Sequence, residues 1–126
     1  MFEIFKIKYL GLQPTAQISD KTLDRIIIRE YKDRVNEVNN KLKLIRSDSR
    51  KGKSRISVAV LKLSNREFNT IDTYIERCNN DFRDIVTQAE YPRVSKLDFD
   101  EIASNKLKNL YLEDWKEYTS WLNKEK

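Results

Sequence analysis

Apolar residues recur every three or four positions through much of this chain, which is the spacing that places them on one face of an α-helix. The longest such run has seven apolar members: Leu23, Ile27, Tyr31, Val35, Val38, Leu42 and Ile45. Ser19 precedes the run as a candidate N-cap, and Asp20 falls in the first turn, where the helix dipole favours an acid. The pattern therefore predicts one long amphipathic helix over about residues 20–46.

Shorter runs with the same spacing follow. One predicts a helix that begins after Ser64 or Asn65 and has this inner face: Phe68, Ile71, Ile75 and Cys78. Asp81 is a candidate cap for the next helix, which Tyr91-Pro92 ends because the residue before a proline disfavours helical geometry. After a segment that Asp98 would cap, a last helix carries these apolar residues: Trp115, Tyr118, Trp121 and Leu122.

Two segments fit both a helix and a strand. Residues 2–10 have an apolar pattern too short for its period to be decided, and Gly11 and Pro14 follow as helix-ending signals. Residues 55–63 alternate like a strand at Ile56, Val58 and Val60, yet the same segment fits a buried helix. Because a lone strand would have no partner, we expect both segments to be helical.

Composition supports a helical fold. The chain has 126 residues, of which only two are glycine and two are proline, whereas an all-β fold needs many turn residues. Charged residues make up 36% of the chain, an amount that the solvated faces of long helices can carry. We therefore expect residues 1–126 to form one all-α domain, a bundle of five or six helices.

The residue inventory also limits the chemistry. The chain has no histidine and one cysteine, Cys78, which excludes histidine-based nucleophilic sites, histidine and multi-cysteine zinc sites, and an intramolecular disulfide. The two glycines are isolated, so no phosphate-binding loop is present. We expect no enzymatic activity and no cofactor. A single cysteine and the lack of a long apolar run favour a cytoplasmic location away from the membrane.

Charge is concentrated in one segment. Residues 41–55 contain seven basic residues and one acid, Asp48, a net charge of +6 in a chain whose total is +5. Residues 47–54 are polar and include Gly52, so we expect an exposed loop there. The candidates for binding an anion or a partner are Arg46, Arg50, Lys51, Lys53 and Arg55. The simpler alternative is a solvated loop, since the segment has no aromatic residue on which a base could stack.

Two other clusters have a functional and a simpler interpretation. Asp81 and Asp84 share a helix face and are weak candidates for a metal site, although capping and ion pairing explain them more simply. An aromatic group is a candidate interface and, alternatively, part of the core; its members are Tyr111, Trp115, Tyr118 and Trp121. The sequence thus favours a non-enzymatic protein-interaction or regulatory module, with self-association one option. The alternative is non-specific nucleic-acid binding through residues 41–55, and a cation-dependent enzyme ranks last.

Overall fold

The computed structural model describes residues 17–47, 49–97 and 106–124, and in these ranges all regular structure is helical. The elements are α2 (Asp20–Glu30), α3 (Val35–Leu42), α4 (Arg50–Ser64), α5 (Thr70–Asn80), α6 (Phe82–Glu90), the 3₁₀ helix η2 (Val94–Lys96) and α8 (Lys106–Asn123). The predicted all-α class is confirmed. The predicted helix over 2–10 and the predicted cap at Asp98 lie outside the described residues. Within those ranges, none of the helices combines the length and apolar character that crossing a membrane requires.

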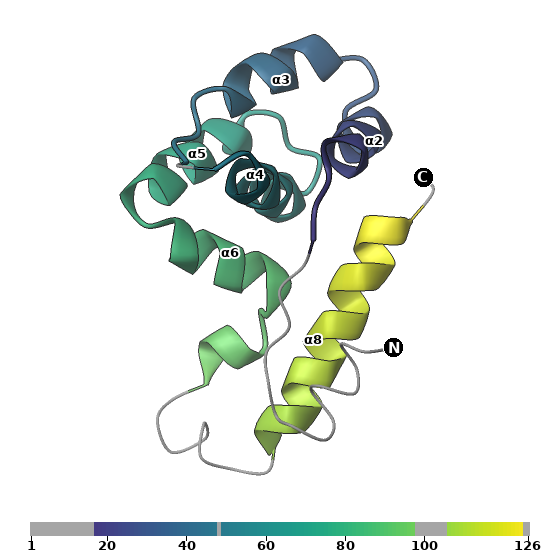
Figure 1. Cartoon of the computed structure of the whole chain (residues 1–126), viewed down its shortest axis with the longest axis vertical. Coiled ribbons are helices and arrows are strands. Elements are labelled where there is room, and N and C mark those ends of the chain that lie inside the picture. Colours follow the sequence, from purple (N-terminus) through teal and green to yellow (C-terminus); the bar gives the residue numbers. More distant parts are fainter. Residues whose placement is uncertain (1–16, 48, 98–105, 125–126) are drawn as a thin grey trace.

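Helix α4 occupies the centre of the fold. Figure 1 shows it end-on, with α2, α3, α5 and α6 around it and α8 to one side. Its most extensive contacts are with α6 and α5. All residues from Ile56 to Leu61 are buried, so this helix is enclosed on nearly every face. Such burial explains the ambiguous pattern of residues 55–63, and the prediction of a helix there is confirmed.

The predicted long helix over 20–46 is wrong, because the chain forms two helices there. Helix α2 ends at Glu30, and Tyr31 leaves helical geometry with φ −137° and ψ 52°. After a turn closed by the Arg34 N–H bond to the Tyr31 carbonyl, α3 begins at Val35. The break lets α2 pack on α4 while α3 packs on α5. A straight helix of that length would carry one end beyond the core, so tertiary packing overrides the continuous period.

The prediction of an exposed loop over 47–54 is also wrong for residues 50–54, which belong to α4. Ser49 is the N-cap of α4, and its hydroxyl accepts a hydrogen bond from the Gly52 amide at 2.9 Å. Residues from Arg50 onward are therefore helical. A Cβ at Gly52 would lie 2.7 Å from the Ser49 hydroxyl oxygen and 3.0 Å from that of Ser47, so the glycine makes room for the cap.

Helix boundaries further along agree in part with the sequence. Asn65 is not the cap of the following helix but the left-handed C-cap of α4, with φ 49°, and α5 begins only at Thr70. The predicted cap at Asp81 is confirmed, since its carboxylate accepts from the Arg83 amide at the start of α6. Helix α6 ends at Glu90, directly before Tyr91-Pro92, as predicted.

Polar contacts attach α8 to the rest of the domain. Arg25 and Arg29 of α2 donate to its last carbonyls: Arg25 Nη2 lies 2.6 Å from the Leu122 oxygen and Arg29 Nη1 lies 2.7 Å from the Trp121 oxygen. These arginines cap the negative end of the α8 dipole. Midway along α8, the buried carboxylate of Asp114 accepts from the Arg93 side chain at 2.8 Å and from the amide that opens η2.

We predict that Gly52→Ala gives no net stabilisation, although this change in a helix usually adds about 1 kcal/mol. The new methyl group displaces the Ser49 hydroxyl, and loss of an N-cap costs about 1 kcal/mol. In a Ser49→Ala background the same change should stabilise, because the cap is already lost. Urea unfolding of the four proteins in this double-mutant cycle measures the coupling. Equal effects of Gly52→Ala in both backgrounds would contradict the proposed crowding.

We also predict that Asp114→Asn destabilises the protein by about 2–4 kcal/mol, because an amide cannot accept all the hydrogen bonds that converge on the buried carboxylate. Glu113→Gln is the matched control. Its carboxylate lies 3.5 Å from the same Arg93 but is 61% exposed, so its removal should cost less than about 1 kcal/mol. Urea unfolding measures both, and similar losses would show that Asp114 does not anchor α8.

Candidate anion-binding site

The turn between α3 and α4 carries the basic segment, and Asn79 at the end of α5 holds it in place. The Asn79 side chain accepts a hydrogen bond from the Arg46 amide at 2.9 Å and donates one to the Leu44 carbonyl at 3.0 Å. One amide group therefore satisfies both a donor and an acceptor of the turn. This fixes the backbone from which Arg46 extends, while its side chain stays exposed.

A cavity of about 340 Å³ opens beside this turn, and we call it the Arg55 cleft. It lies between the start of α4 and the start of α6. Its lining residues are Arg46, Ser47, Ser49, Gly52, Arg55, Ile56, Phe82 and Val86. Phe82 is the first residue of α6 and is 48% exposed, an unusual exposure for so large an apolar side chain. The cleft thus combines guanidinium groups with an accessible aromatic ring.

A second cavity of about 270 Å³, the Lys53 hollow, lies on the other side of the first turns of α4. Its lining residues are Asp20, Leu23, Asn39, Leu42, Lys43, Lys53, Ser54 and Ser57. Lys53 Nζ lies 3.4 Å from the Lys43 carbonyl oxygen, which joins the end of α3 to the start of α4. Gly52 lines the cleft and Lys53 lines the hollow, so the two cavities flank the first turns of α4. We call them together the basic face.

The basic face is electrostatically unusual. The first turn of α4 contains no acid, although a helix N-terminus is the positive end of the dipole and normally attracts one. Within the described residues, Lys43, Arg46 and Lys53 form no ion pair with a carboxylate. Asp20 is the acid of the Lys53 hollow, and its carboxylate accepts a hydrogen bond from Ser54 at 3.0 Å. An anion on this face would meet four basic residues against one acid, Asp20, and a favourable helix dipole.

Arg55 differs from the other basic residues because it is held rigidly. Its Nε and Nη2 atoms each donate to one oxygen of Glu90, both at 2.7 Å. Glu90 is the last residue of α6, and its side chain is 1% exposed. Hydrogen bonds to Glu90 raise the pKa of the Arg55 guanidinium above its ordinary value, which keeps it charged at all accessible pH.

The structure separates the seven basic residues of the segment into groups. Lys41 is not available to a ligand: its ammonium group lies 2.7 Å from Asp72 Oδ2 and 3.8 Å from the centre of the Phe68 ring. Arg46, Lys53 and Arg55 line the basic face, as does Lys43. Arg50 and Lys51 lie in the first turn of α4, but their side chains are outside the described part of the structure.

The aromatic candidates for an interface serve mainly to pack α8. Tyr118 is buried, so it belongs to the core. Tyr111, Trp115 and Trp121 are half-buried. The Tyr111 and Tyr91 rings form a T-shaped pair with ring centres 5.3 Å apart, and the centre of the Trp121 ring lies 4.8 Å from the guanidinium of Arg29.

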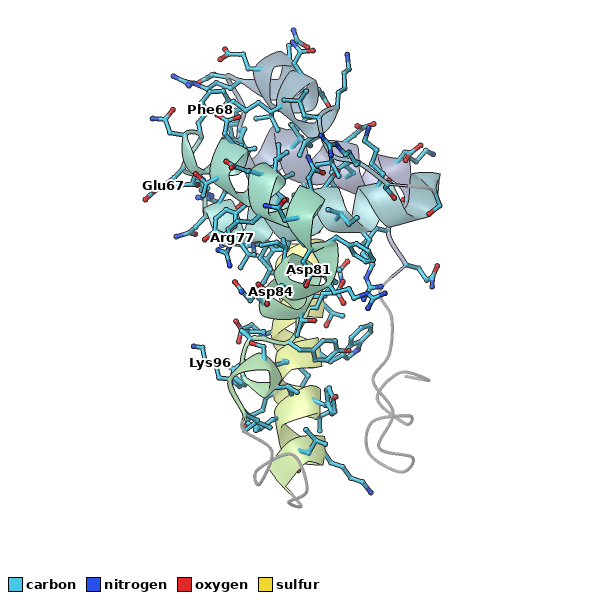
Figure 2. The ribbon with its side chains drawn as sticks, turned by 90° about the vertical axis from the view of Figure 1, so that its left-hand side faces the viewer. Glu67, Phe68, Arg77, Asp81, Asp84 and Lys96 are labelled. Atoms are coloured by element: carbon cyan, nitrogen blue, oxygen red, sulfur yellow. The ribbon has the colours of Figure 1, made fainter. Side chains whose placement is uncertain are left out.

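The weak metal candidates have other partners. Figure 2 shows Asp81 and Asp84 close together at the start of α6, with Arg77 nearby. Asp81 caps the helix, whereas Asp84 Oδ2 lies 3.6 Å from Arg77 Nη2 and accepts from Gln88. Among the described residues, no three histidine, cysteine or acidic side chains gather in a group that could hold a metal ion.

Two residues of the site could not be assigned to it from the sequence. Phe82 fits the apolar side of a predicted helix, and Glu90 is one of many acids. The only local signal is position: Phe82 follows the capping residue and therefore starts the helix, where a side chain is least covered. Glu90 is 35 residues from Arg55, and no pattern in the chain links them.

A larger cavity, of about 540 Å³, lies beside Tyr31 and Phe68 but lacks the same bias of charge. Glu30 pairs there with Arg66 at 3.1 Å, and the remaining charged residues of its lining are of both signs: Lys32, Asp33, Arg34 and Glu67. Burial is the main cause that raises the pKa of Tyr31 to about 12, so its hydroxyl stays neutral. This cavity therefore offers no net attraction for an ion of either sign.

No protein-family model, curated protein or solved structure matches this chain. The function must accordingly be inferred from the geometry and charge of the basic face.

Proposed function

We propose that this protein is a non-enzymatic binding module for single-stranded nucleic acid. The observation that carries the proposal is the basic face itself, where two cavities beside the first turns of α4 are lined by cations and one of them also by an exposed aromatic ring. Single-strand binders combine a positive groove for the phosphates with aromatic rings on which bases stack. Both parts occur together in the lining of the Arg55 cleft.

The positions of the cations favour an extended ligand over a single small anion. Lys43 and Lys53 line one cavity and Arg46 and Arg55 line the other, so cations lie on both sides of the first turns of α4. A strand with a phosphate on each nucleotide can contact cations in both cavities at once. Binding of this kind releases counterions and is independent of sequence.

An acidic protein segment is the second candidate, and it corresponds to the interaction module that the sequence favours. The observation in its favour is Leu44, which is 63% exposed in the same turn as Arg46. Leu44 and Phe82 could contact apolar residues of a partner while its acids meet the cations. Phe82 serves both candidates, whereas Leu44 has no role in nucleic-acid binding.

We predict that Arg46→Ala combined with Lys53→Ala weakens binding of a labelled oligothymidylate of about ten nucleotides. Loss of two phosphate contacts should reduce the slope of log affinity against log salt by about 1.4. Fluorescence anisotropy over a range of salt concentrations measures both effects. The control is Lys32→Ala with Lys96→Ala, which removes the same charge from exposed positions outside the basic face; Figure 2 shows Lys96 on η2, beyond the end of α6.

Equal loss of affinity in the two double variants would mean that only total charge matters and would contradict a defined site. If the wild-type protein binds no oligothymidylate but binds a polyglutamate peptide with the same dependence on Arg46 and Lys53, the acidic protein segment replaces nucleic acid as the ligand.

We further predict that Phe82→Ala weakens oligothymidylate binding by about 5- to 150-fold while leaving the salt slope unchanged, because stacking on one base contributes about 1–3 kcal/mol and involves no counterion. Phe82→Trp should preserve the affinity, since the indole also stacks. Phe82→Leu is the control for apolar area without an aromatic face. Affinity retained in the leucine variant would argue against stacking.

A further inference from the structure

The ion pair between Arg55 and Glu90 lies where the Arg55 cleft meets the core. The Arg55 side chain is 28% exposed and lines the cleft, whereas Glu90 is almost completely buried. The buried side chains of Tyr91 and Tyr118 are close to this pair. Burial raises the pKa of both tyrosines, and the charge of Glu90 raises it further, so neither hydroxyl carries a competing charge.

Apart from the pairing with Arg55, the position of Glu90 does not favour an acid. Glu90 is the final residue of α6, at the negative end of that helix dipole, and its burial removes it from water. An apolar pair of similar volume is often as stable as a buried ion pair or more stable. A costly arrangement of this kind is expected where it contributes to function.

The pair with Glu90 uses only one edge of the guanidinium. Glu90 accepts from Nε and Nη2, which form one edge of the group. The second edge consists of one N–H of Nη1 and the remaining N–H of Nη2, two parallel donors. That pattern matches two oxygens of a phosphate group.

We propose that Arg55 binds a phosphate group of the bound strand through this second edge, and that Glu90 is the positioning residue for the Arg55 guanidinium. The inference rests on the proposed function and makes it more specific. The exposed cations Arg46 and Lys43 attract the strand, while Arg55 fixes one phosphate in the cleft. Because its orientation is set before binding, Arg55 loses little conformational freedom when the ligand arrives.

The direction in which Glu90→Gln changes oligothymidylate affinity distinguishes a positioning role of Glu90 from a purely electrostatic one. The change removes a negative charge near the cleft, so a purely electrostatic role for Arg55 predicts tighter oligothymidylate binding. Positioning predicts weaker binding, by about three- to tenfold, because an amide cannot accept from both nitrogens. Arg55→Lys keeps the charge but loses the planar edge, and we expect about tenfold weaker binding with a nearly unchanged salt slope.

A measurement on the wild-type protein avoids any loss of folding in the variants. In ¹⁵N-labelled protein, the Nε–H signal of Arg55, identified by its loss in Arg55→Lys, should shift on titration with inorganic phosphate and with oligothymidylate. The signal of Arg93 is the internal control, since this arginine pairs with Asp114 outside the cleft and should not move.

Tighter binding by Glu90→Gln, or an Arg55 signal that moves no more than that of Arg93, overturns the inference. If affinity still depends on Arg46 and Lys53 in that case, the proposed function stands without it. An Arg55 signal that shifts with phosphate in a protein that binds no oligothymidylate supports the phosphate site and rejects the nucleic-acid function.

Discussion

Because Ile56, Val58 and Val60 are all buried, helix α4 needs neighbours on nearly every side, and the other helices are arranged to supply them. Helices α2, α5 and α6 cover its middle, and α3 reaches the core beside α5. The first turns of α4 are partly exposed where they follow the turn held by Asn79. The basic residues that precede the buried stretch are therefore displayed around the start of the helix, with a cavity on each side.

The electrostatics of this region oppose the usual preferences of helix ends. Basic residues occupy the positive end of α4, and Glu90 occupies the negative end of α6. One hydrogen-bonded ion pair, Arg55 with Glu90, links the two ends. Elsewhere the rule is followed in part: Ser19 and Asp20 begin α2, and arginines of α2 cap the end of α8, whereas Glu30 ends α2 and the first turn of α8 has no acid. What sets the region around the Arg55 cleft apart is that the two departures there are joined by this buried ion pair.

Helix α8 illustrates how the same residues can support different interpretations before a fold is known. Its aromatic residues have a spacing typical of either a core or an interface. Tyr118 enters the core, while Trp121 lies beside the guanidinium of Arg29, which also caps the helix. Asp114 fixes the middle of α8 against η2. A helix attached by directional polar contacts at its centre and its end has a defined register, which apolar packing alone specifies less strictly.

The sequence by itself determined the features that depend on neighbouring residues: the helical class, the caps at Ser19 and Asp81, the end of α6 before Tyr91-Pro92, and the concentration of charge in residues 41–55. Capping, helical period and the restriction imposed by proline act over a few positions, so they are visible in the chain. The break after Glu30 and the placement of Phe82 and Glu90 beside Arg55 were decided only by tertiary structure. They arise from packing and hydrogen bonds between residues about thirty positions apart, for which no local pattern exists.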